Sequence, residues 1–102
     1  MADFKVAFHP SFVQGLKEVK VNQVQFSELM KKIEAAASDV EAYTQRLRGL
    51  PAQFRKLNFL DTRVVLWHSK NTLYVLRIFH RRQGYSKESF ENLLKLIREY
   101  TA

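Results

Sequence analysis

The spacing of the hydrophobic side chains changes halfway along this chain, and that change restricts the folds open to it. Between residues 22 and 37, apolar residues recur at the three- and four-residue intervals of an amphipathic helix. Between residues 54 and 81, β-branched and aromatic residues dominate and alternate as they do in strands. A helical first half followed by a strand-rich second half predicts an α+β domain.

The first half contains three predicted elements. Residues 3–8 alternate between apolar and polar and predict a strand. Residues 10–19 predict a short helix, and residues 22–37 predict a longer one. Asn22 suits its N-cap, and Gln25 stands three residues later, as in a capping box. We expect these two helices to form a hairpin on one face of a sheet.

The second half contains three strand candidates and a last helix. The strands are expected at residues 54–60, 63–69 and 72–81, and the helix at residues 86–99. Residues 38–48 are ambiguous and could open a further helix at Ser38. The predicted order is therefore β-α-α-β-β-β-α. We expect an antiparallel sheet of about four strands, with the N-terminal helical hairpin on one face and a C-terminal helix.

Length and composition exclude several classes of protein. The 102 residues predict a single domain over 1–102. The chain has no cysteine, which excludes disulfides, thiolate catalysis and cysteine-based zinc sites. No stretch approaches the roughly 18 apolar residues of a membrane span, and the first ten residues lack an apolar signal-peptide core. We expect a cytoplasmic protein without a membrane partner.

The positive charge is concentrated in the second half. The formal net charge is +7, of which residues 1–50 carry 7 − 6 = +1 and residues 51–102 carry 10 − 4 = +6. Residues 54–82 hold seven basic side chains and one acidic one. Such a field suits nucleic acid, an anionic membrane or an acidic protein. The alternative is a solvated basic surface without a specific partner.

Strand alternation gathers basic and aromatic side chains on one predicted sheet face. That face would present Arg63, Arg77 and Arg81, with Lys56 or Arg55, beside Trp67 and Phe79. The same alternation assigns Tyr74, Leu76 and His80 to the opposite face. Basic residues interleaved with aromatic ones hold single-stranded RNA, because charges follow the phosphates and rings stack on bases. Alternatively, these arginines form ion pairs and their stems cover apolar surface.

Metal-free phosphoryl chemistry is the reaction that the residues favour. The three histidines have no metal-ligand spacing, so we expect neither a metal nor another cofactor. RNA carries its own nucleophile, the 2′-hydroxyl. A protein need only align it, remove its proton, neutralise the phosphorane-like charge and protonate the leaving oxygen. Residues 78–85 supply arginine, histidine and tyrosine where the last strand enters a loop.

Several segments together resemble the RelE/ParE toxin superfamily of toxin–antitoxin systems. They are Phe8-His9-Pro10-Ser11-Phe12, Leu47-Arg48-Gly49-Leu50-Pro51 with the following Phe54-Arg55-Lys56-Leu57, Thr62-Arg63-Val64-Val65-Leu66-Trp67, and Leu76-Arg77-Ile78-Phe79-His80-Arg81-Arg82 before Tyr85-Ser86. The resemblance covers nearly the whole chain. It implies a RelE-like toxin, a ribosome-dependent endoribonuclease that cuts mRNA in the A site without a metal. Its partners would be a cognate antitoxin, the ribosome and mRNA.

The resemblance also implies roles for individual residues. Tyr85 resembles the general base, Arg81 the group that steadies the leaving oxygen, and Arg63 the one that stabilises the phosphate. His80 would act as an acid or base, and the order among these groups stays open. The expected RNA-binding residues are Arg55, Lys56, Arg77, Arg82 and Trp67.

Two other functions stay open. ParE-like members of the superfamily inhibit DNA gyrase and lack nuclease activity, so gyrase is an alternative partner. The chain could also be a catalytically inactive module that binds RNA or an antitoxin. In either case Tyr85 would anchor the last helix instead.

Overall fold

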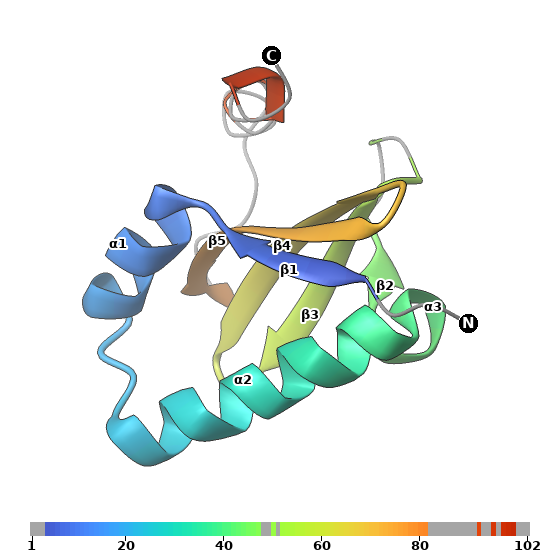
Figure 1. Ribbon diagram of the computed structural model, residues 1–102. Helices are drawn as coiled ribbons and strands as arrows, with labels where there is room; N and C mark the ends of the chain where they lie inside the picture. The colour runs from blue at the N-terminus through green and yellow to red at the C-terminus, as the bar shows by residue number, and fades with distance from the viewer. Residues whose placement is uncertain are drawn as a thin grey trace.

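The computed structural model describes residues 4–47, 50, 52–81, 92, 95 and 97–99. Five strands and three helices precede residue 81, and residues 92, 95 and 97–99 are also helical (Figure 1). In chain order the elements are β1 (Lys5–Phe8), α1 (Pro10–Glu18), α2 (Gln23–Ser38), α3 (Val40–Tyr43), β2 (Gln45–Arg46), β3 (Phe54–Phe59), β4 (Thr62–Ser69) and β5 (Thr72–His80).

The strands form one mixed sheet in the order β1-β5-β4-β3-β2. Neighbours from β2 to β5 pair antiparallel, whereas β1 lies parallel to β5. The predicted α+β class is confirmed, but the four-stranded antiparallel sheet is wrong. Local patterns do not fix the direction of β1, because all the other elements separate it from β5 and leave room for a parallel crossover. β2 spans only two residues, too few for alternation to be visible.

Capping side chains set the start of each helix. Asn22 and Gln25 form the predicted capping box, in which each side chain accepts the backbone N–H of the other, at 2.8 and 3.1 Å. His9 caps α1 and accepts the N–H of Ser11 at 3.0 Å. Asp39 caps α3, a single turn. The ambiguous segment 38–48 thus begins with the last residue of α2 and contains one helical turn, Val40–Tyr43, and a short edge strand, Gln45–Arg46.

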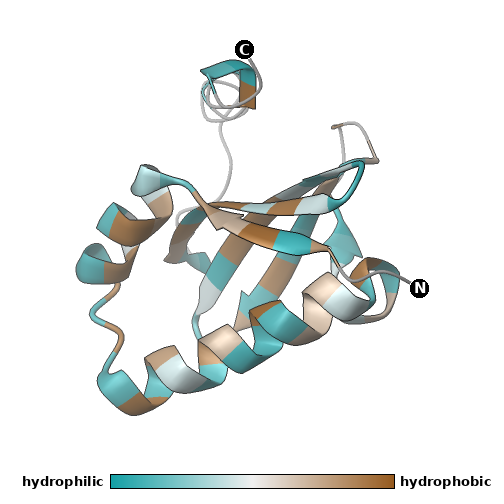
Figure 2. Cartoon of the chain, viewed as in Figure 1, coloured by the Kyte–Doolittle hydropathy of each residue, from teal (hydrophilic) through white to brown (hydrophobic). Residues whose placement is uncertain are grey.

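The main core lies between the helices and one face of the sheet. In Figure 2 both α1 and α2 alternate between apolar and polar residues, as expected for helices that cover a sheet on one side only. Both N-terminal helices contribute to this core, as predicted, but α1 packs chiefly on β5 and the two helices do not pack on each other as a hairpin. The buried residues of this main core are Phe12, Leu29, Ile33, Ala36, Ala37, Val40, Leu57, Phe59, Val64, Leu66, Leu73, Val75 and Ile78.

Gly15 allows α1 to lie directly against β5. A Cβ atom at this position would stand 2.5 Å from the carbonyl oxygen of Ile78 and 2.9 Å from its Cγ2. Both distances are shorter than van der Waals contact, so the glycine is required by the close approach. Ile78 stands between Arg77 and Phe79. The contact with α1 therefore supports the part of β5 that carries these two residues of the predicted basic and aromatic face.

A second core lies on the opposite face of the sheet. Its buried members are Leu47, Leu50, Phe54, Val65, Leu76 and Ile97. Ile97 belongs to the described part of the C-terminal helix, which lies on the side of the sheet away from α2 (Figure 1). The rest of the helix predicted at 86–99 lies outside the described residues. No helix in the described part of the chain is long and apolar enough to cross a membrane.

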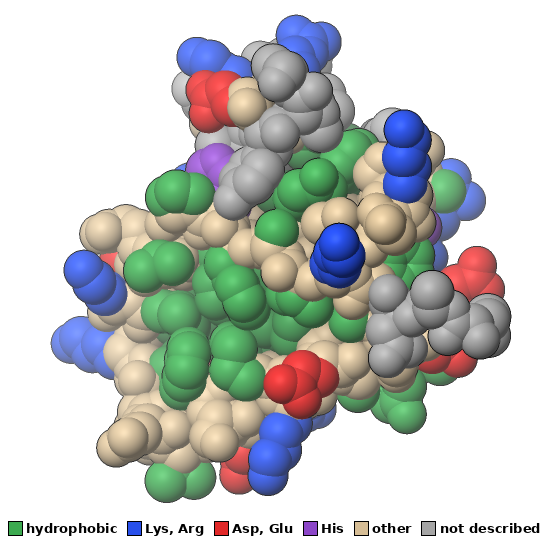
Figure 3. Space-filling model, viewed as in Figure 1, with side chains coloured by type: hydrophobic (Ala, Val, Ile, Leu, Met, Phe, Trp, Pro, Cys, Tyr) green, Lys and Arg blue, Asp and Glu red, His purple; other side chains and the backbone are tan. Residues whose placement is uncertain are grey.

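Apolar side chains of α1, β1 and α2 remain exposed to solvent. Phe8, Val13 and Phe26 are 40%, 48% and 41% exposed. Figure 3 shows hydrophobic side chains gathered over α1, β1 and α2. This surface, the α1–β1–α2 surface, is apolar although the chain carries a net charge of +7.

Candidate nucleic-acid interface

A β-bulge in β5 decides which side chains share the sheet face opposite α2. Val65 of β4 pairs with Arg77, whereas the next residue, Leu66, pairs with Val75. Leu76 therefore has no opposite residue on β4. A bulge of this kind places one extra residue in a strand and shifts the alternation beyond it by one position.

The bulge changes the faces that strict alternation assigns to β5. Leu76 is buried in the second core with Val65, and both Tyr74 and Phe79 pack against that core. Arg77 is the cross-strand partner of Val65 and therefore shares its face. The expectation that Tyr74 and Leu76 oppose Arg77 and Phe79 is wrong, because an extra residue separates the two halves of the strand.

Basic side chains surround Val65 on this face. Val65 pairs with Lys56 on one side and with Arg77 on the other. Arg63 precedes Val65 by two residues and therefore belongs to the same face. All three basic residues are half-buried. Their positions are held by strands, so they are more restricted than charges on a surface loop.

Arg81 joins this group at the end of β5. Its backbone N–H donates to the carbonyl oxygen of Asp61, in the turn between β3 and β4, at 2.8 Å. Phe79 is the direct partner of Arg63, so Arg81 occupies the diagonal position, for which the separation in an antiparallel pair is about 7–8 Å. We call Lys56, Arg63, Arg77 and Arg81 the basic face.

The strands that carry the basic face contain no acidic residue. β3, β4 and β5 include four arginine and lysine side chains and neither aspartate nor glutamate. The positive charge of the basic face is therefore not balanced within its own strands. A surface of this kind raises the local concentration of polyanions.

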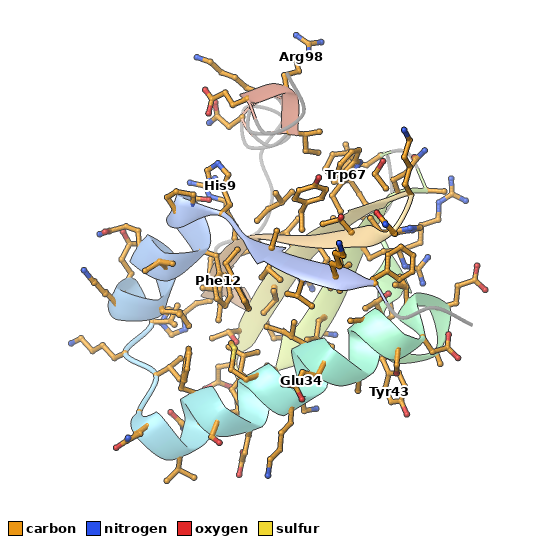
Figure 4. The ribbon with its side chains drawn as sticks, in the orientation of Figure 1. His9, Phe12, Glu34, Tyr43, Trp67 and Arg98 are labelled. Carbon is orange, nitrogen blue, oxygen red and sulfur yellow. The ribbon has the colours of Figure 1, made fainter. Side chains whose placement is uncertain are left out.

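An aromatic pair lies beside the basic face. Trp67 and Tyr74 are direct cross-strand partners, and their ring centroids are 5.3 Å apart with an interplanar angle of 36°. Both are half-buried. Figure 4 shows Trp67 on the side of the sheet away from Glu34 and α2. Sequence reasoning missed Tyr74, since only the bulge brings it to this face and no local signal marks the bulge.

Arg55 and His80 lie on the other face. Arg55 is the partner of Leu66, a main-core residue, and its Nε and Nη2 donate to the side chain and carbonyl oxygens of Thr44, both at 2.9 Å. His80 pairs with Thr62, two residues from main-core Val64 on β4, and its side chain is exposed. The structure therefore does not bring Arg55 or His80 onto the basic face. Their proposed roles stay predictions.

The other two histidines, His9 and His68, have lowered pKa values, which favour the neutral form. Burial lowers the pKa of His9; Glu99 then raises it and Arg77 lowers it. Burial also lowers the pKa of His68, as does the charge of Arg55. Both side chains are expected to be neutral near pH 7, which agrees with a structural role for each.

Two predicted site residues, Tyr85 and Arg82, lie outside the described residues. Over the residues that the structure does describe, no group of three or more histidine, aspartate or glutamate side chains could hold a metal ion. The described side chains of the basic face supply guanidinium and ammonium groups next to aromatic rings.

Comparison with protein-family models and with curated proteins gives no match. The structure is, however, similar to solved structures. The toxin–antitoxin complex RelBE2 from Mycobacterium tuberculosis matches with a TM-score of 0.66 and 17% identity, over 79% of this chain and 94% of that chain.

Two other solved structures also have a similar fold. The RelB–RelE antitoxin–toxin complex from Methanococcus jannaschii matches with a TM-score of 0.57 and 16% identity, over 74% of this chain and 91% of that one. The E. coli DinJ–YafQ toxin–antitoxin complex matches with a TM-score of 0.61 and 10% identity, over 82% of this chain and 99% of that one. The predicted resemblance is confirmed at the level of the fold: this chain has the fold of RelE-like toxins.

Proposed function

We propose that this protein is the toxin of a type II toxin–antitoxin module, an endoribonuclease that cleaves ribosome-bound mRNA in the A site and so inhibits translation. The observation that carries this proposal is the basic face, three cations on acid-free strands and Arg81 directly after β5, beside an aromatic pair. The fold shared with RelE and YafQ proteins supports it.

The proposed reaction needs only groups that RNA and protein side chains supply. The 2′-oxygen attacks the adjacent phosphorus, and the new 2′-O–P bond replaces the bond from phosphorus to the 5′-oxygen. A base takes the 2′-hydroxyl proton, and an acid gives a proton to the departing 5′-oxygen. The products are a 2′,3′-cyclic phosphate and a free 5′-hydroxyl.

Arg63 and Arg81 are the residues on the basic face best placed for the charged steps. A half-buried guanidinium on a strand is preorganised to stabilise the negative charge that grows on the phosphate oxygens. Arg81, at the exposed end of β5, has more freedom to follow the leaving oxygen. Tyr85 is our candidate for the general base. Removing one such stabilising donor lowers kcat by about 10²- to 10³-fold.

We further propose that the α1–β1–α2 surface is covered by the antitoxin. The RelBE2, RelB–RelE and DinJ–YafQ structures are all toxin–antitoxin complexes. Exposed phenylalanine side chains at Phe8 and Phe26 offer an apolar surface of the kind that protein partners cover. An antitoxin with an acidic segment would also complement the positive charge of the chain.

Primer extension on a reporter mRNA translated with the purified protein tests the nuclease. Wild-type protein should cut the mRNA within codons. It should also do so when a chelator is present under conditions that leave the ribosome intact. Arg63→Ala and Arg81→Ala should cut at least about 10²-fold more slowly. Arg46→Ala is the matched control, because Arg46 is an exposed arginine on β2, away from the basic face.

Three outcomes would contradict this proposal. An intact mRNA with normal translation would exclude the nuclease, and DNA cleavage that depends on gyrase would then indicate a ParE-like inhibitor. A protein that is harmless on expression but binds a partner would indicate an inactive module. Cleavage that persists in both arginine variants would keep the activity but place its site elsewhere.

A further inference from the structure

We infer that Trp67 and Tyr74 form a stacking subsite for a base of single-stranded RNA, at the end of the basic face next to the turn between β4 and β5. This inference rests on the proposed function, because it concerns the same face. It adds a contact to the base where the basic face offers only contacts to phosphate.

The two rings are held by packing on the second core and keep part of their surface accessible. As direct cross-strand partners, with centroids 5.3 Å apart, they form one aromatic unit. They pack against the second core, which contains Val65 and Leu76, and each remains half-buried. A rigid ring that keeps accessible surface can stack on a base at a small cost in side-chain entropy.

The subsite is aligned with the charges. Trp67 and Arg63 are four residues apart on β4, a separation of about 13 Å at the usual strand rise. Lys56 and Arg77 lie between them, as the two partners of Val65. Val65 itself is buried in the second core, so an RNA strand would pass along the rim of this core, with one phosphate near Arg63 and another near Lys56 or Arg77. One of its bases would then reach the aromatic pair.

Charge complementarity favours RNA over a protein partner at this place. The strands around the aromatic pair carry no acidic side chain, and Lys70 adds another cation in the turn next to it. An acidic peptide would satisfy the charges but would not need two stacked rings. A flexible single strand satisfies both, because every base has a flat face and every linkage a phosphate.

The test uses Trp67 as its own probe, since it is the only tryptophan of the chain. A 2′-O-methyl oligoadenylate cannot be cleaved by attack of the 2′-oxygen, so its binding is measured apart from catalysis. We expect it to quench the emission of Trp67 in a saturable way. An abasic ribose-phosphate oligomer of equal length should bind more weakly and leave the emission nearly unchanged.

Variants separate stacking from charge. Tyr74→Leu should weaken oligoadenylate binding about 5- to 100-fold without changing the slope of log K against log salt concentration. Tyr74→Phe keeps the ring and should bind like the wild type. Lys56→Ala should instead reduce the salt slope by about 0.7. Tyr43→Leu is the matched control, because Tyr43 is exposed on α3, beyond the opposite face of the sheet (Figure 4).

The outcomes for the subsite and for the nuclease are distinguishable. The subsite is excluded if fluorescence anisotropy detects oligoadenylate binding while Trp67 emission stays constant. It is also excluded if Tyr74→Leu binds like the wild type, even if mRNA is cleaved. Saturable quenching without mRNA cleavage would support the subsite and exclude the nuclease. Absence of any binding would exclude the subsite, whereas the nuclease is decided separately by primer extension on translated mRNA. Since quenching is measured on the wild-type protein, a variant that fails to fold does not remove the test.

Discussion

Replacing Gly15 by alanine should destabilise this protein, although the same change stabilises most helices. Gly15 lies inside α1, where alanine is preferred over glycine by about 0.8–1 kcal/mol. The added methyl group would, however, stand 2.5 Å from the carbonyl oxygen of Ile78 and 2.9 Å from its Cγ2. Helix propensity and packing therefore act in opposite directions at this residue.

The packing cost should exceed the gain in helix propensity. Forcing a methyl group into a well-packed site costs about 1–3 kcal/mol. The cost at Gly15 should lie in the upper half of that range, because the atom that it meets is backbone and cannot rotate away. After subtraction of the helix term, the expected net loss is about 1–2 kcal/mol. At about 4–8 °C per kcal/mol for a domain of this size, Tm should fall by at least about 4 °C.

Thermal and urea unfolding followed by circular dichroism measure this loss. Gln14→Gly is the matched control, since Gln14 is an exposed neighbour in the same helix and its change reports helix propensity alone. Gln14→Gly should cost about 0.5–1 kcal/mol. If Gly15→Ala raised Tm by as much as Gln14→Gly lowers it, the contact between α1 and β5 would not be as close as the structure shows.

Three other predictions concern Asn22, Arg55 and His9, with Lys56 as the comparison for Arg55. Asn22→Ala should lower the free energy of unfolding by about 1 kcal/mol in urea unfolding, because it removes the capping box, whereas Asn22→Asp should not. Arg55→Ala should lower it by about 1–2 kcal/mol, since hydrogen-bond acceptors in Thr44 lose their donor, and should weaken RNA binding less than Lys56→Ala does. Lys56→Ala should leave the free energy of unfolding nearly unchanged, and a larger loss of RNA binding in Arg55→Ala than in Lys56→Ala would contradict this division. His9 has a lowered pKa in the folded protein, so the unfolded state binds more protons once the pH falls below 6.5, and Tm should decrease there. His9→Asn keeps a capping acceptor and should reduce this acid sensitivity; an unchanged profile of Tm against pH would show that His9 is not its source.

Part of the candidate site could be predicted from the sequence, and part could not. Alternation alone places Arg63 and Trp67 on one face, because β4 pairs with β3 without a register shift between them. The face of Tyr74 could not be predicted, since alternation holds only while the strand has no bulge. Arg55 could not be separated from Lys56 until its hydrogen bonds to Thr44 were visible.

The local elements could be predicted from the sequence, because their causes are local. The capping box at Asn22, the apolar stripe of α2 and the alternation along β4 all depend on residues a few positions apart. Only the tertiary structure decided the parallel direction of β1, the bulge at Leu76 and the contact of Gly15 with Ile78. Each of these depends on residues distant in the sequence, and the free energy that selects them comes from packing between elements, which no local pattern records.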